Sequence, residues 1–206
     1  INDKIEGTLS DSKKINIIAI SKTFKMIDIK PLIEHGHIHF GENKVQEAVE
    51  KWTDIKKNKS EIKIHLVGRL QTNKVKYAVK IFDFIHSLDS KKLAEKISEE
   101  QVKQKIKPKI FIQINIGNEI QKSGISTQDI EEFLNECIKL DLNIIGTMCL
   151  PPLNLNSGIF FSRMEKINND LKLKDLSMGM SEDYLNALEY RSTHLRIGSK
   201  IFGERN

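Results

Sequence analysis

The sequence has little cysteine, no long apolar run and few aromatic residues, and each shortage removes a class of protein. Among 206 residues there are two cysteines, Cys137 and Cys149, which form neither a disulfide framework nor a metal-ligand spacing. We expect both to be small buried residues in a reducing compartment. No stretch approaches the length of a membrane span, and no signal-peptide pattern opens the chain, so a cytoplasmic location is expected.

The shortage of aromatic residues argues against a nucleic-acid-binding surface, despite the positive charge. Aromatic residues make up 6% of the chain, and the formal net charge is +5. The lysines are scattered over nearly every helical segment, and no RNA-binding or helix-turn-helix signature accompanies them. Solvated helix faces account for this charge, which would assist binding of a small anion only weakly. We therefore expect no nucleic-acid partner.

Short β-branched runs alternate with longer amphipathic segments along the chain, a pattern typical of βαβ units and a parallel sheet. Strands are predicted at 16–21, 37–41, 63–68, 82–88, 109–115, 143–149, 175–178 and 194–197. Helices are predicted at 27–35, 44–57, 72–79, 90–105, 127–140, 158–171 and 182–191. Several of these helices open at a residue suited to N-capping, namely Asn43, Ser90, Thr127 and Ser181.

Eight strands alternating with helices favour an α/β fold with a single (β/α)8 TIM barrel, formed as one domain over residues 1–206. A doubly wound open sheet is the alternative fold. No helix is predicted after the last strand, and residues 1–12 are interpreted as the remnant of an N-terminal helix that covers this gap. The segment that begins at Pro151–Pro152 is the only strongly punctuated loop.

Lys22 closes the first apolar run, where a parallel barrel places its ligand chemistry. A lysine there either forms a Schiff base or extends its amine into water, and position alone favours the solvated lysine. The glycines that follow the last two strands change this balance, because TIM barrels commonly bind phosphate in those two loops. A Schiff-base lysine that faces a phosphate cradle is typical of a pyridoxal phosphate (PLP) site.

Six motifs then occur in order: IAISKT (18–23), FGEN followed by VQE (40–47), HLVGRLQTNK (65–74), KSG (122–124), LSMGMS (176–181) and RIGSKIFGER (196–205). Together they closely resemble the pyridoxal phosphate homeostasis proteins, the YggS or PROSC family. The resemblance runs from Ile17 to Arg205. The family fold resembles the N-terminal domain of alanine racemase, which agrees with the barrel expected from the strand count.

The resemblance implies a role for seven residues of this sequence. Lys22 matches the lysine that holds PLP as a Schiff base; Ser177, Gly198 and Ser199 match phosphate-binding positions; Arg196 matches the arginine that faces the pyridine nitrogen; Asn43 flanks the cofactor ring; and Met178 supports the pocket by packing. A guanidinium beside the ring nitrogen disfavours its protonation, so the ring becomes a poorer electron sink.

The function that the resemblance implies is therefore intracellular PLP homeostasis, by buffering the cofactor or delivering it to apo-enzymes, without significant catalytic turnover. A monomer is expected. The alternative is a PLP-dependent enzyme similar to an amino-acid racemase, although the second base that alanine racemase takes from another domain or subunit is not evident here. A third interpretation makes Lys22 the Schiff-base lysine of a sugar-phosphate aldolase.

The other polar residues give weaker indications of a functional role. The histidines at 35, 37 and 39 could suggest a metal, but no carboxylate or cysteine is placed to complete a site, so none is assigned. His65 is interpreted as a hydrogen-bonding residue of the barrel interior, and Glu47 as the partner of a lysine. Lys122 follows the fifth strand, and its role at the cofactor rim or on the surface stays open.

Two departures from the family pattern bear on the pocket. Lys44 stands where the family often has an aromatic or otherwise larger residue, so packing beside the ring is expected to differ. The segment 151–161 looks shorter than its counterpart, which leaves any lid or partner surface undecided.

Overall fold

The centre of the molecule is a closed barrel of eight parallel strands that follow one another in chain order. The structure is a computed structural model and describes residues 1, 4–5, 15–153 and 155–204. The strands are β1 Asn16–Ile20, β2 His39–Glu42, β3 Lys63–Leu66, β4 Phe84–Leu88, β5 Lys109–Ile114, β6 Ile144–Cys149, β7 Asp175–Met180 and β8 His194–Ile197. Pairing of β8 with β1, from Asn16 opposite His194 to Ala19 opposite Ile197, closes the ring. The predicted barrel is confirmed.

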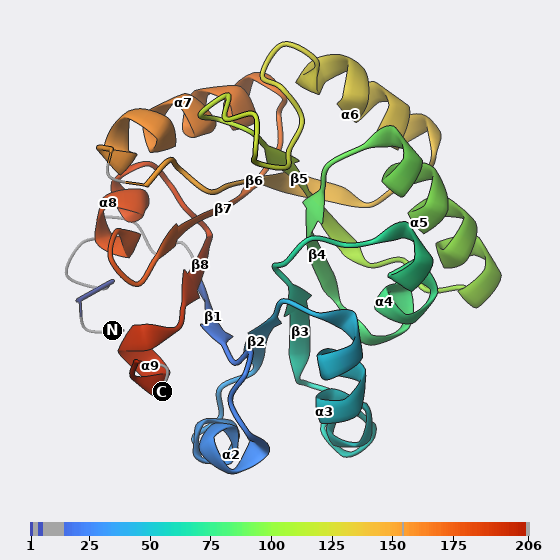
Figure 1. Cartoon of the computed structure of the whole chain (residues 1–206), viewed down its shortest axis with the longest axis vertical. Helices are drawn as coiled ribbons and strands as arrows, with labels where there is room; N and C mark the ends of the chain where they lie inside the picture. Colours follow the sequence, from blue (N-terminus) through green and yellow to red (C-terminus); the bar gives the residue numbers. More distant parts are fainter. Residues whose placement is uncertain (2–3, 6–14, 154, 205–206) are drawn as a thin grey trace.

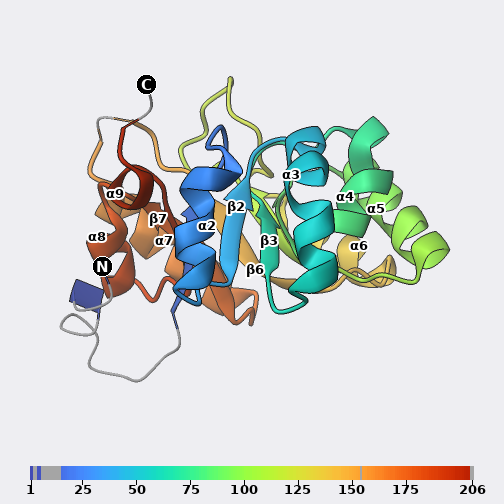
Figure 2. The same ribbon diagram turned by 90° about the horizontal axis from the view of Figure 1, so that it is seen from below.

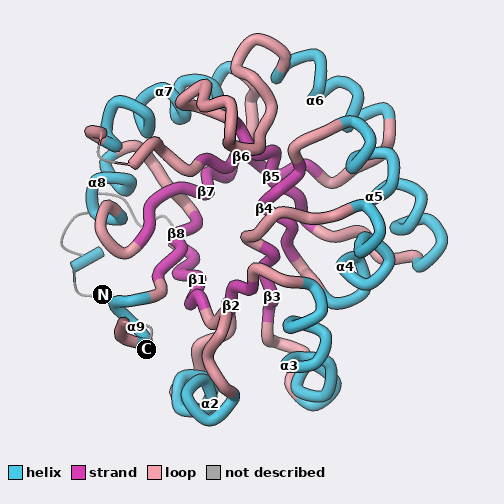
Figure 3. Tube along the Cα trace, viewed as in Figure 1, coloured by secondary structure: helices cyan, strands magenta, loops and turns pink. Residues whose placement is uncertain are grey.

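Helices surround the strands as an outer layer (Figures 1 and 3). They are α2 Met26–Glu34, α3 Val45–Asn58, the 3₁₀ turn η1 Thr72–Lys74, α4 Val75–Ile81, α5 Lys91–Gln104, α6 Ile130–Lys139, α7 Ser157–Asp170, α8 Tyr184–Glu189 and α9 Ser199–Phe202. In α5 the residues Leu93, Ala94, Ile97 and Gln101 are buried, a helical spacing that turns one face to the barrel. This helix thus covers the strands with one face.

The structure corrects several predicted boundaries. A short helix, α9, follows β8, where no helix was predicted; it ends at Gly203, whose φ of 82° suits a glycine after a helix terminus. β7 continues to Met180, beyond the predicted end at Met178. The helix predicted from Thr127 begins at Ile130, because Ser126 and Asp129 form a turn with a side-chain hydrogen bond of 2.6 Å. Most of the predicted N-terminal helix over 1–12 lies outside the described residues.

The barrel interior is a second core, separate from the layer between strands and helices. Phe84, Phe111 and Met148 form its apolar part. Side chains two residues apart on a strand point to the same face, so β4 places His86 inside together with Phe84, and β3 adds His65. His65 stacks on Phe84 with centroids 4.2 Å apart, and His86 stacks on Phe111 at 4.3 Å. The interior therefore combines aromatic packing with polar rings.

Candidate functional site

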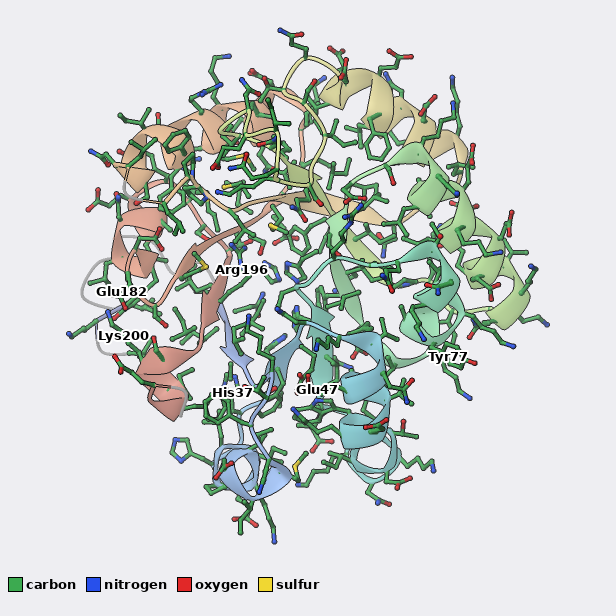
Figure 4. The ribbon with its side chains drawn as sticks, viewed as in Figure 1. His37, Glu47, Tyr77, Glu182, Arg196 and Lys200 are labelled. Atoms are coloured by element: carbon green, nitrogen blue, oxygen red, sulfur yellow. The ribbon has the colours of Figure 1, made fainter. Side chains whose placement is uncertain are left out.

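A cavity of about 780 Å³ lies at the carboxyl ends of the strands. Its lining includes five of the seven residues predicted from the sequence, namely Lys22, Asn43, Arg196, Gly198 and Ser199. The side-chain view in Figure 4 shows Arg196 toward the middle of the barrel, with Glu182 and Lys200 further out. Residues from both ends of the chain meet here because β1 and β8 are neighbours in the closed barrel. We call this cavity the upper pocket.

The loop that carries Lys22 is fixed on both sides of the lysine. The hydroxyl of Ser21 donates to Oε1 of Glu42 at 2.8 Å, and the backbone N–H of Thr23 donates to Oε1 of Glu47 at 2.6 Å. Thr23 has a φ of 70°, an uncommon left-handed conformation for a non-glycine residue. The turn after β1 is therefore held in one conformation by two carboxylates from outside it.

A buried lysine joins these two carboxylates. Nζ of Lys51 donates to Glu42 at 3.0 Å, to Glu47 at 2.9 Å and to the backbone oxygen of Ser21 at 3.0 Å. Burial raises the pKa of Glu42, although hydrogen bonds from Trp52, Lys51 and Ser21 oppose that rise. For Glu47, burial alone would raise the pKa, but hydrogen bonds from Lys51 and Thr23 outweigh it and lower the pKa. The cluster ties α3 to the loop of Lys22.

Asn43 reaches the upper pocket because the turn after β3 approaches it closely. A Cβ on Gly68 would lie 2.4 Å from the backbone oxygen of Asn43, so only glycine permits this approach. On the other side of the pocket, the ring of Phe24 stacks on Phe202 of α9 with centroids 4.8 Å apart. The unpredicted helix α9 therefore packs directly against the segment that follows Lys22.

Arg196 is buried, and the backbone of two neighbouring strands orients it. One guanidinium nitrogen donates to both the backbone oxygen and the hydroxyl of Ser177, each at 2.7 Å. The other donates to the backbone oxygen of Cys149 at 2.8 Å. Burial lowers the pKa of Arg196, yet arginine remains protonated in proteins. The result is a fixed positive charge at the base of the upper pocket.

A chain of histidines continues from Ser177 through the barrel interior. His86 Nδ1 lies 2.9 Å from Ser177 Oγ, and His65 Nδ1 lies 2.9 Å from His86 Nε2. His39 Nδ1 in turn lies 2.9 Å from His65 Nε2. Burial, followed by the charge of neighbouring groups, lowers the pKa of His65 and of His86 well below the usual value, so both rings are neutral.

The hydrogen-bond donors in this row of histidines can be assigned by starting from Arg196. Because Arg196 donates to the Ser177 hydroxyl, the hydroxyl hydrogen is left for Nδ1 of His86. His86 then carries its proton on Nε2 and donates to His65, which donates from Nε2 to His39. Each ring is both donor and acceptor, so the chain needs no charged histidine.

Two predicted residues do not reach the upper pocket. The hydroxyl of Ser177 is enclosed in the barrel by Arg196 and His86, and Met178 is buried in the core between strands and helices. Side chains alternate along β7, so Ser177 points inward and Met178 points outward. The structure therefore places both residues outside the lining of the upper pocket, Ser177 inside the barrel and Met178 in the core between strands and helices.

The sequence interpretation missed Met180 and Ser181, both of which line the upper pocket. Gly179 has a φ of 91°, and the β7–β8 register shifts between Ser177 and Met180, so the chain bulges here. The Ser181 hydroxyl accepts a hydrogen bond from the backbone N–H of Gly198 at 3.2 Å. The glycine inside LSMGMS was the available signal for a bulge that brings the second serine of this motif to the pocket.

Several polar groups outside the upper pocket have defined surroundings. Within the described residues no group of three or more His, Cys, Asp or Glu side chains could hold a metal ion. His65 is an interior hydrogen-bonding residue and Glu47 pairs with a lysine, as predicted. Both cysteines are buried and free, and burial raises each pKa to about 12.

Lys122 and Lys44 lie at the edge of the site. Lys122 pairs with Glu119 and donates to the backbone oxygen of Pro151, a pocket residue, at 3.1 Å. Lys44 is exposed and precedes the first residue of α3. Leu153 and Leu155 of the punctuated loop line the pocket while remaining largely exposed.

Comparison with known proteins assigns the class of protein that this barrel and pocket define. Residues 8–206 match the family described as alanine racemase, N-terminal domain. An alanine racemase from Clostridium difficile 630 superposes with a TM-score of 0.74 over 99% of this chain and 55% of the racemase, at 16% identity. At that identity the match supports the fold alone, and it confirms the resemblance to the racemase barrel.

Closer relatives define the family. The pyridoxal phosphate homeostasis protein of Aquifex aeolicus is 34% identical over 199 residues, which cover 92% of this chain and 86% of the relative. PipY of Synechococcus elongatus, in a structure with PLP bound, has a TM-score of 0.87 at 31% identity and covers 98% of both chains. This chain belongs to the pyridoxal phosphate homeostasis protein family.

Proposed function

We propose that this protein binds PLP in the upper pocket through a reversible covalent bond to Nζ of Lys22 and serves intracellular PLP homeostasis. The observation that carries the proposal is the meeting of three kinds of group in one cavity. An amine on Lys22, a fixed guanidinium on Arg196 and the hydroxyl and glycine group of Ser181, Gly198 and Ser199 all line it. The related PipY, which binds PLP, supports the same assignment.

The residues present fit this cofactor. PLP supplies an aldehyde, an aromatic pyridine ring and a phosphate, and its aldehyde reacts reversibly with amines. The phosphate would meet the hydroxyls of Ser181 and Ser199 and the backbone at the start of α9, where N–H donors suit an anion. Ile20, Phe24 and Val67 supply apolar surface for the ring.

Arg196 suits storage of the cofactor more than its use in catalysis. Its guanidinium carries a permanent positive charge, and Ser177 and Cys149 hold it in place. A cation held near the pyridine nitrogen disfavours a proton on that nitrogen, and a neutral ring withdraws electrons less strongly. The site would therefore retain PLP while giving little activation of bound amino acids.

The pocket lining also argues against the racemase alternative. Racemisation needs a proton donor on one face of the substrate and an acceptor on the other. No tyrosine, histidine or cysteine lines the part of the pocket that the structure describes; its acidic side chains are Glu182, Asp183 and Glu204. Asp183 is engaged, because its Oδ1 accepts the backbone N–H of Met180 at 2.7 Å. We infer a carrier without significant turnover, with PLP-dependent apo-enzymes as recipients.

Several further points belong to the same proposal. In the described residues no helix is long and apolar enough to cross a membrane. A cytoplasmic location and a monomeric state remain proposals. Analytical ultracentrifugation with and without PLP tests the monomeric state. A dimer in which a partner residue completes the upper pocket would contradict that state.

The test of the function compares two lysine variants. Wild-type protein incubated with PLP should turn yellow, and borohydride reduction followed by peptide mass spectrometry should place the cofactor on Lys22. Lys22→Ala should lose both signals. Lys44→Ala removes the same charge from an exposed lysine beside the pocket residue Asn43, and should keep both. A colourless wild-type protein would refute cofactor binding.

A second measurement separates carrier from enzyme. Transfer of PLP from the loaded protein to an apo-enzyme should restore the activity of that enzyme, and the carrier should lose its colour in parallel. Racemisation of alanine by the loaded protein should stay at the rate of free PLP. Lys22-dependent racemisation well above that rate would favour the racemase alternative.

A further inference from the structure

A second cavity of about 780 Å³ opens at the opposite end of the barrel, where the strands begin. Figure 2 shows the barrel from the side, with the loop that follows β5 projecting beyond the upper end. Every strand contributes a residue to this second cavity: Asn16, His39, Lys63, Phe84, Lys109, Ile145, Asp175 and His194. No described residue lines both cavities. We call this one the lower cavity; its volume is in the range of small-molecule sites.

The lining of the lower cavity is strongly basic. It contains five lysines and two aspartates. Lys56 pairs with Asp83 at 2.7 Å, and Lys107 pairs with Asp141. The other three lysines have no carboxylate oxygen within 4.0 Å among the residues that the structure describes; they are Lys63, Lys80 and Lys109.

The floor of the lower cavity is built from buried neutral groups. His194 accepts from the side-chain amide of Asn16 at 3.1 Å, and burial, helped by the positive charge of Lys109 and Arg196, lowers its pKa to about 3. Nζ of Lys109 lies 5.2 Å from the ring centroid of Phe84. The cavity therefore holds positive charge that Asp175, the lining carboxylate that interacts with Lys109, balances only in part.

Stability alone does not account for this arrangement. The residues at the amino ends of barrel strands ordinarily serve packing and stability. Lys63, Lys80 and Lys109 line one hollow without an ion-pair partner among the described residues, so their like charges repel one another, and a carboxylate in place of any of them would relieve the repulsion. The existing aspartates leave a net excess of positive charge in the lining, and a bound dianion would balance it.

We propose that the lower cavity is a second binding site, which takes a small phosphate-bearing anion with at least two negative charges. Lys63, Lys80 and Lys109 supply its charge, and Asn16 and His39 supply polar groups at its floor. The site is independent of the proposed PLP pocket, because the two share no lining residue. Loss of one is therefore measurable without loss of the other.

The experiment titrates the full-length chain with pyrophosphate by isothermal titration calorimetry at constant ionic strength. Lys63→Ala combined with Lys109→Ala should weaken binding by at least about tenfold, since each removes a charge from the cavity. Lys76→Ala combined with Lys92→Ala removes the same charge from exposed lysines outside the cavity and should leave the affinity unchanged. Both double variants should still turn yellow with PLP.

Imidazole resonances of labelled histidine locate the bound anion. Pyrophosphate should shift the signals of His39 and His194 in the wild type, and the shifts should disappear in the Lys63/Lys109 variant. Sodium chloride at equal ionic strength should not reproduce them. The proposal is overturned if chloride gives the same shifts, if the Lys63/Lys109 variant binds pyrophosphate like the wild type, or if both double variants weaken binding equally.

Discussion

At the scale of single residues, Lys51 is the group that holds the loop of Lys22. Its side chain is 10% exposed and neutralises Glu42, whose side chain is 0% exposed. Replacing Lys51 with Met should lower the free energy of unfolding by about 3–5 kcal/mol, because the Glu42 carboxylate would remain buried without its ion-pair partner. Urea denaturation followed by circular dichroism measures the change. The same variant should bind PLP more weakly, since Ser21 and Thr23 lose their common anchor.

A double-mutant cycle checks that the loss arises from the stranded carboxylate. Adding Glu42→Gln to Lys51→Met should recover part of the stability, so the double variant should be less destabilised than the sum of the single ones. Lys57→Met is the control, because its ion pair with Asp54 is exposed and its loss should leave the stability nearly unchanged. Simple additivity would contradict the role given to Lys51.

Comparing Ser177 with Ser192 tests whether the Ser177 hydroxyl positions Arg196 or acts only as an ordinary buried hydroxyl. Both serines are buried, and the hydroxyl of Ser192 donates to the backbone oxygen of Met178 at 2.7 Å. Either serine changed to alanine should cost about 1–3 kcal/mol of stability, because a buried polar group loses its partner. Only Ser177→Ala should alter the visible spectrum of bound PLP, since only Ser177 touches Arg196. Equal spectra would refute the positioning of Arg196 by Ser177.

At the scale of elements, the inward faces of β3, β4 and β8 carry histidines that burial keeps uncharged in the folded state. The pKa is lowered in His65, His86 and His194, chiefly by burial. Unfolded histidine takes up a proton near pH 6.5, so the stability from these rings is present above that pH and is lost as the pH falls. Each ring contributes a slope of up to about 1.4 kcal/mol per pH unit.

The measurement is a set of urea denaturations between pH 7 and pH 5. Stability should fall through this window, although the raised pKa of Glu42 works in the opposite direction, because folded Glu42 takes up a proton before the unfolded chain does. His86→Asn should reduce the slope of stability against pH by the contribution of one histidine, because the unfolded chain then takes up one proton fewer. A pH-independent stability would contradict the neutral histidine chain.

The elements also show what sequence patterns can predict. All eight strands were predicted, because alternating apolar runs report burial on a barrel directly. The end of β7 was not predicted, since the bulge at Gly179 depends on the pairing of β7 with β8. Ser181, which follows this bulge and lines the upper pocket, was therefore not selected from the sequence. The histidine chain was visible only as the interior role of His65. Its partners come from strands far apart in the sequence, and local patterns carry no information on such contacts.

At the scale of the whole molecule, closure of the barrel makes every strand depend on two neighbours, including β1 and β8 from opposite ends of the chain. The chemistry follows from this closure. Lys22 and Arg196 meet in the upper pocket only because β1 pairs with β8, while the basic residues that begin the strands gather at the lower cavity. The barrel thus has one cavity at each end, and among the described residues the two share no lining residue.

Closure predicts cooperative unfolding, which Trp52 can report. It is the only tryptophan, is fully buried, and donates to Glu42 at 3.0 Å between α3 and β2. Its fluorescence should change at the same urea concentration as far-ultraviolet circular dichroism, because opening any strand pair exposes both neighbours. The colour of bound PLP should vanish in the same transition, since the pocket joins the first and last strands. A separate earlier loss of colour would show that the β1–β8 seam opens before the rest of the barrel, and would make that seam a route for cofactor release.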